Sequence, residues 1–181
     1  MKSYLFCILF LAIIPTCLQD RPEGVCRLET KYDSESDTTT VHCDLAEFHD
    51  APTRLTIQAV ASYRGKEPNE TTKFWLQLSG FIAGATRRTQ PVFHEAAAIS
   101  LMLDTTRLEI PVSDYHNDFF ELNHLLAESA RAEISREELR KLLDAKSLKA
   151  EWGGVGLKFS NASLGSLKTF IHRQVFVAET R

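Results

Sequence analysis

The alternation of apolar and polar residues along two stretches of the chain constrains its fold more than any other feature of the sequence. Residues 54–64 and 72–81 repeat with a period of two, which is typical of strands with one buried face. The shared faces would hold Leu55, Ile57, Ala59, Ala61 and Tyr63 in the first stretch, and Phe74, Leu76 and Leu78 in the second. A polar, turn-forming segment lies between the two stretches, so the sequence predicts a long antiparallel hairpin.

Further segments with strand composition lie on both sides of this hairpin. They are residues 25–32, 37–45, 98–104 and 107–113. In the last pair, a turn at Thr105 and Thr106 would place Leu101 and Leu103 opposite Leu108, Ile110 and Val112. The first 113 residues thus contain six candidate strands joined by short turns, and this predicts antiparallel sheets packed as a sandwich.

The residues that follow have a different periodicity. Apolar side chains recur every three or four positions over residues 119–130, which favours a helix. A strand over residues 125–134 is the alternative.

Helical signals dominate the last third of the chain. Ser135 and Glu138 form a capping box, and the helix that they open would bury Leu139, Leu142, Leu143 and Ala145. The pair Gly153-Gly154 between two alternating runs predicts a hairpin. Asn161 or Ser163 would cap a final helix that buries Leu164, Leu167, Phe170 and Ile171. The expected fold class is α+β: an antiparallel β-sandwich with two or three short helices toward the C-terminus.

The N-terminus has the composition of a secretory signal. Lys2 precedes an apolar run over residues 4–14, which is too short to span a bilayer as a helix of about 20 residues. We therefore expect residues 1–18 to be a signal peptide, and residues 19–181 to form a single globular domain that is secreted or periplasmic. The alternative is a lipid anchor at Cys17, although Thr16 and Pro15 depart from the lipobox pattern of bacterial lipoproteins. Contact with a membrane is expected only if Cys17 is lipidated.

Two of the four cysteines, Cys26 and Cys43, lie beyond the signal and are expected to form a disulfide. A hairpin turning between Ser34 and Glu35 would place them directly opposite each other, close enough to bridge. The neighbouring His42 would point to the other face of its strand, which argues against a zinc site.

The charge of the chain bears on the class of partner. Loss of Lys2 with the signal takes the formal net charge from −3 to −4. A weakly acidic domain lacks the basic footprint of a nucleic-acid binder, so no nucleic-acid partner is expected.

No motif for catalysis, metal binding or cofactor binding is present, so no catalytic residue, metal ligand or cofactor is predicted. The strongest local cluster is Asp114, His116 and Asp118, in a predicted loop after a strand, and it lacks the later Gly and Glu of a calcium loop. Four cations would give a small basic patch suited to anionic glycans or lipid headgroups: Arg64, Lys66, Arg87 and Arg88. Asn69 and Asn161 begin N-glycosylation sequons.

The end of the chain also resembles known proteins. Residues 135–145, 148–152 and 157–160, followed by a leucine-spaced helix, are similar to the endings of small uncharacterised exported bacterial β-sandwich proteins. The resemblance implies a sandwich fold and a bacterial envelope or extracellular setting. It implies no catalytic residue.

These features favour one functional class and leave two alternatives. The favoured function is a non-catalytic binding or scaffolding domain outside the cytosol, with a protein or glycan partner. One alternative is an envelope protein anchored through Cys17. The other is a hydrolase whose active site, with Asp114, His116 and a serine, assembles only in three dimensions.

Overall fold

The computed structural model describes residues 26–50, 53–91 and 97–176. The predicted signal peptide and Cys17 lie outside these residues. Strands and two α-helices build the described part of the chain, and every strand pairing in it is antiparallel. This confirms a mostly antiparallel β architecture with two short α-helices in the last third.

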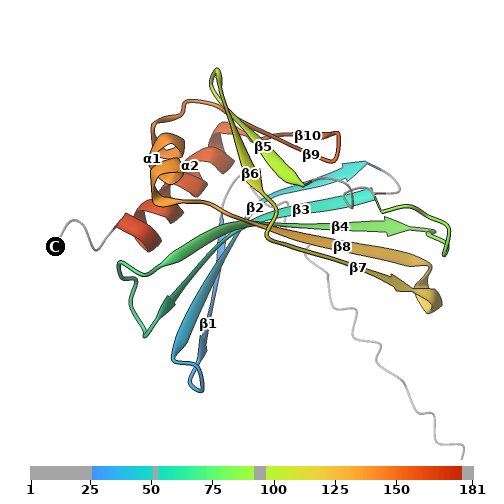
Figure 1. Ribbon diagram of the computed structural model, residues 1–181, viewed down its shortest axis with the longest axis horizontal. Coiled ribbons are helices and arrows are strands. Elements are labelled where there is room, and N and C mark those ends of the chain that lie inside the picture. Colours follow the sequence, from blue (N-terminus) through green and yellow to red (C-terminus); the bar gives the residue numbers. More distant parts are fainter. Residues whose placement is uncertain (1–25, 51–52, 92–96, 177–181) are drawn as a thin grey trace, which may run out of the picture.

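The larger sheet has six strands (Figure 1). In spatial order they are β1 (Arg27–Asp33), β2 (Thr38–Asp50), β3 (Thr53–Arg64), β4 (Lys73–Ala83), β8 (Leu125–Glu133) and β7 (Asp114–Phe120). The expected long hairpin is present as β3 and β4, with Ala59 opposite Leu76. All the residues predicted to face inward on these two strands are buried.

The smaller sheet has four strands. In spatial order they are β10 (Val155–Lys158), β9 (Leu148–Trp152), β5 (Ala98–Leu103) and β6 (Thr106–Pro111). The predicted Gly153-Gly154 hairpin joins β9 to β10, and both glycines have the positive φ that this tight turn requires. The turn between β5 and β6 is formed by Asp104 and Thr105, one residue earlier than expected, because Asp104 adopts a left-handed conformation with φ of 52°.

Both helices and the smaller sheet lie on one side of the larger sheet (Figure 1). The helices are α1 (Arg136–Asp144) and α2 (Asn161–Ile171), and a π-helical segment, His172–Phe176, follows α2. The rings of Phe74 on β4 and Phe170 on α2 lie 6.0 Å apart in the core. We call this covered side of the larger sheet its inner face, and the opposite side its outer face. No helix in the described residues has the length and apolar composition needed to cross a membrane.

The helix caps were predicted with mixed success. The capping box is confirmed, since Ser135 Oγ accepts from the Glu138 N–H while Glu138 accepts from the Ser135 N–H. The cap of α2 is Ser160, however, so the prediction of Asn161 or Ser163 was wrong. Ser160 Oγ accepts from the Ser163 N–H at 3.0 Å, and Asn161 is already the first helical residue.

The helix predicted over residues 119–130 is also wrong, and the strand alternative is correct. The chain forms β7, a short 3-10 turn (Glu121–Asn123) and β8, so Phe119 lies opposite Leu126. The spacing of three and four residues arose because the chain reverses at this turn. Asp114, His116 and Asp118, which were expected in a loop, are part of β7.

The disulfide between Cys26 and Cys43 is present, with a Cα–Cα distance of 5.3 Å. The register of its hairpin differs from the prediction, because Cys43 lies opposite Leu28 and Cys26 lies just before β1. The cause is a four-residue turn over residues 34–37, in which Asp37 has a positive φ of 50°. The bridge is therefore diagonal and fastens the beginning of β1 to β2.

Candidate ligand-binding face

The outer face of the larger sheet is open to solvent, unlike the inner face. On its central strands the outward side chains are only partly buried, with Val60 the exception among the described residues. Most of these side chains are polar. The outer face is therefore a broad, mostly polar surface that is available to a partner.

Uncharged polar side chains occupy the middle of this face. Thr56, Ser79 and Ser129 lie opposite one another across β3, β4 and β8, and Gln58 and Gln77 form the adjacent pair. The amide of Gln58 donates to Asp44 Oδ1 at 2.7 Å. The side chains of Thr56, Gln77, Ser79 and Ser129 have no hydrogen-bond partner in the described part of the chain, so they are free to bind a polar ligand.

An aromatic residue lies beside these polar side chains. Trp75 is on β4, and the guanidinium of Arg131 on β8 lies 5.6 Å from the centre of its ring. Trp75 Nε1 is buried and has no acceptor among the described residues. The sequence pattern marked residue 75 only as an outward strand position, because the neighbour that covers its ring, Arg131, lies on a strand that was expected only as an alternative.

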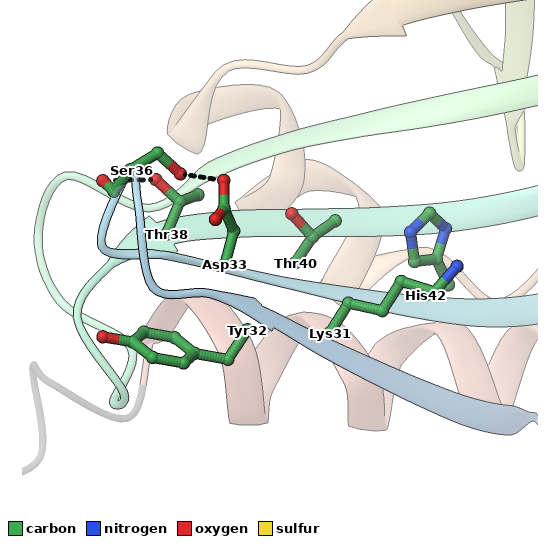
Figure 2. Close-up of a pocket in the computed structure, with 7 residues that line it drawn as sticks. All are labelled: Lys31, Tyr32, Asp33, Ser36, Thr38, Thr40 and His42. Atoms are coloured by element: carbon green, nitrogen blue, oxygen red, sulfur yellow. Dashed lines mark hydrogen bonds between the residues drawn. The ribbon is translucent and has the colours of Figure 1, made fainter.

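A hollow of about 640 Å³ extends the outer face over β1 and β2 (Figure 2). Lys31, Thr38, Thr40 and His42 line it, and the ammonium of Lys31 lies 3.3 Å from Glu29. Burial lowers the pKa of His42, although nearby Glu29 acts in the opposite direction. His42 is therefore neutral at pH 7, and the hollow offers both hydrogen-bond donors and acceptors.

The predicted polar cluster lies at the edge of the same face. His116 Nε2 is 2.8 Å from Asp114 Oδ1, and Asp114 also lies 3.9 Å from Arg131. Asp118 is further along β7, opposite Ala127. No group of three or more His, Cys, Asp or Glu side chains is placed to hold a metal ion in the part of the chain that the structure describes.

Ser129 lies opposite His116, which gives the three residue types of a hydrolytic triad on one surface. No hydrogen bond joins Ser129 to His116 among the described residues, and the His116 side chain is 71% exposed. A solvated edge strand does not exclude water or polarise a nucleophile as a catalytic cleft does.

The basic residues do not form the single patch that the sequence suggested. Arg64 ends β3 and Lys66 lies just after it, near Asp37 (3.6 Å from Arg64) and the Tyr32 ring (5.4 Å from Lys66). Arg87 lies beyond the other end of β4, where it pairs with Glu121. The length of β4, about 33 Å at 3.3 Å per residue, separates the two pairs.

The sequons have different surroundings. Asn69 is part of a turn, where its Oδ1 accepts from the Thr71 N–H and hydroxyl while its amide donates to the Arg64 carbonyl. Asn161 is exposed at the start of α2.

One buried polar pair was missed by sequence reasoning. The Tyr115 hydroxyl on β7 donates to Glu128 Oε1 on β8 at 3.0 Å, on the inner face, and Glu128 is buried. A glutamate at an inward position of an alternating strand is an identifiable signal. It was hidden because residues 119–130 were expected to be helical.

Comparison of the chain with protein-family models, curated proteins and solved structures found no match.

Proposed function

We propose that this chain is an exported, non-catalytic binding domain, a β-sandwich with a partly helical cover, whose outer face binds a glycan. The observation that carries the proposal is the set of four neighbouring polar side chains without hydrogen-bond partners in the described residues, Thr56, Gln77, Ser79 and Ser129. Hydroxyl and amide groups of this kind match the hydroxyl-rich surface of a sugar chain, and an open sheet face accepts an extended ligand.

A glycan fits this face better than a protein does. Protein interfaces have an apolar, well-packed centre with aromatic anchors. Here the centre is polar, and the ring of Trp75 is covered by Arg131. Charged side chains at the margin, such as Lys31 and Asp114, would contact groups at the ends of the ligand.

The experiment for ligand binding uses tryptophan fluorescence, since Trp75 and Trp152 are the only tryptophans in the chain. Trp152 is buried in the core, so a ligand on the outer face changes the emission of Trp75 alone. We would titrate the protein with soluble peptidoglycan fragments, chito-oligosaccharides and dextran. A saturable change in emission with one of them is expected.

Ser79→Tyr tests where the ligand binds. An aromatic residue suits an outward strand position but would fill the centre of the outer face, so binding should fall by at least about tenfold. Lys149→Tyr is the matched control, since it adds the same ring at an exposed position of β9. The proposal is contradicted if no glycan changes the emission, or if Ser79→Tyr binds as well as Lys149→Tyr.

The proposal of export has two supports. One is the signal-like composition of the N-terminal sequence, and the other is the Cys26–Cys43 disulfide, because disulfides persist where conditions are oxidising. Intact mass of the native protein from soluble and membrane fractions tests it. A mass that begins between residues 18 and 20, with two thiols alkylated only after reduction, is expected. A mass that begins at Cys17 with added acyl chains would support the lipid-anchored alternative, and retention of Met1 would refute export.

A further inference from the structure

The turn between β7 and β8 lies at the end of the larger sheet that is farthest from the helices (Figure 1). Exposed apolar side chains cluster at this end. We call this cluster the hairpin tip and define it as Phe81, Phe120, Leu122 and Leu125. Leu122 is 98% exposed, Phe120 48% and Phe81 38%. Large apolar side chains that remain in water contribute nothing to the core, so their exposure suggests a contact outside the chain.

The strand register makes the hairpin tip continuous. Phe120 lies opposite Leu125, and Leu125 lies opposite Ala83 on β4. Phe81, two residues before Ala83, is on the same outer face. Leu122 is at the apex of the 3-10 turn between β7 and β8. The cluster therefore runs without a break from the outer face of β4 to the turn, where Leu122 protrudes into solvent.

Arginines lie beside the hairpin tip. Arg54 lies opposite Phe81. The loop with Arg87 and Arg88 is held against the β7–β8 turn, because the Ala85 N–H donates to the His124 carbonyl at 2.8 Å and Arg87 pairs with Glu121. Arg88 is exposed and has no ion-pair partner in the described part of the chain. Arg88 therefore remains available to an anionic group at this end of the sheet.

The shape and size of the hairpin tip indicate whether it binds a second copy of the chain, another protein or a lipid bilayer. A second copy would need about 800 Å² of contact from each partner. The three exposed side chains supply about 600 Å² at most, taking about 200 Å² each. A side chain that protrudes from a turn, as Leu122 does, also needs a matching cavity on a protein partner, whereas the fluid interface of a bilayer accommodates it. Apolar side chains enter that interface, and neighbouring cations bind anionic headgroups.

We propose that the hairpin tip docks the domain onto an anionic lipid surface, with Leu122 and Phe120 entering the headgroup region and Arg88 contacting lipid phosphates. This docking is peripheral and independent of both the glycan-binding proposal and a lipid anchor at Cys17. The two surfaces are compatible, because the tip is at one end of the outer face and the polar centre remains uncovered.

The test is sedimentation of the mature chain, starting at residue 19, with vesicles. The chain then lacks Cys17 and any acyl group. We would compare phosphatidylcholine vesicles with vesicles that also contain phosphatidylglycerol. Binding to the anionic vesicles is expected, together with weakening by salt. The double variant Phe120→Ser, Leu122→Ser should reduce the bound fraction by about tenfold or more.

Matched variants elsewhere serve as controls. Leu28→Ser removes an apolar side chain that is also 48% exposed, but on β1, and should leave binding unchanged. Arg88→Glu should weaken binding, while Arg107→Glu on β6 should not. The proposal is overturned if the native chain does not sediment with anionic vesicles, or if the double variant sediments equally. It is also overturned if the tip residues instead mediate concentration-dependent dimerisation in the absence of vesicle binding.

Discussion

At the scale of single residues, the Tyr115–Glu128 pair is a polar contact of the inner face whose loss should be measurable. Glu128 is buried, and the Tyr115 hydroxyl is one of the groups that satisfy it. Tyr115→Phe removes that donor without changing the shape of the ring. We expect the free energy of unfolding at pH 7 to fall by about 1–3 kcal/mol, measured by urea denaturation. Tyr32→Phe, at an exposed position, provides the comparison.

The same pair predicts a dependence of stability on pH. Burial, supported by the hydrogen bond to Glu128, raises the pKa of Tyr115 to about 12. A pKa raised in the folded state stabilises the protein below the unfolded value of about 10, and this contribution is lost as the pH rises toward 12. Unfolding free energies measured between pH 9 and pH 12 should fall less steeply in Tyr115→Phe than in the native chain. Equal slopes would show that Tyr115 titrates normally.

Residue types were easier to predict than residue partners. The inward positions of β3 and β4 follow from alternation alone, because burial of one face requires it. The unpaired polar side chains of the outer face were not predictable, since a hydrogen-bond partner comes from another strand. Asp114 and His116 were identified as a cluster, but their contact depends on β7 being a strand, where residues two apart share a face.

At the scale of elements, the capping box fixes where α1 begins. Ser135 and Glu138 satisfy each other's backbone N–H groups. Ser135→Ala should reduce the free energy of unfolding by about 1 kcal/mol, because the Glu138 N–H would lose its acceptor. Thermal or urea denaturation measures this loss of stability. Ser34→Ala removes the same hydroxyl group in the exposed β1–β2 turn and serves as the control. A loss equal in both variants would contradict the role of the cap.

The disulfide is expected to hold β1 to the sheet. Every residue of β1 is exposed, so burial contributes little to its attachment. Breaking the bridge with Cys26→Ser and Cys43→Ala should reduce stability by about 3 kcal/mol on the chain-entropy model. Hydrogen exchange should then accelerate in β1 more than in β3 and β4, which have buried neighbours on both sides. Uniform acceleration across the sheet would contradict this local role.

Elements with complete local signals were predicted correctly, and those that depend on chain reversal were not. The β3–β4 hairpin and α1 have both periodicity and end signals. The segment that forms β7 and β8 combines two inward residues, Phe119 and Leu126, with Leu122 in an exposed turn, and together they imitate a helical repeat. The register of β1 and β2 depended on the left-handed conformation of Asp37, which sequence spacing does not reveal.

At the scale of the whole molecule, two leucines distinguish the core from the proposed docking surface. Leu167 on α2 is fully buried against the inner face, while Leu122 at the hairpin tip is 98% exposed. Leu167→Ala leaves a cavity between the helix and the sheet, so it should cost about 2–5 kcal/mol of unfolding free energy. Leu122→Ala should change it by less than about 0.5 kcal/mol.

The comparison uses the same substitution and the same denaturation assay, so it separates burial from residue type. If Leu122→Ala also lowered stability by several kcal/mol, Leu122 would be part of the folded core, and a loss of vesicle binding in its variants would reflect unfolding. A stable Leu122→Ala variant makes the vesicle experiment a measurement of surface chemistry. The fold then places its stability at the helix-covered end of the larger sheet and leaves the opposite end for external contacts.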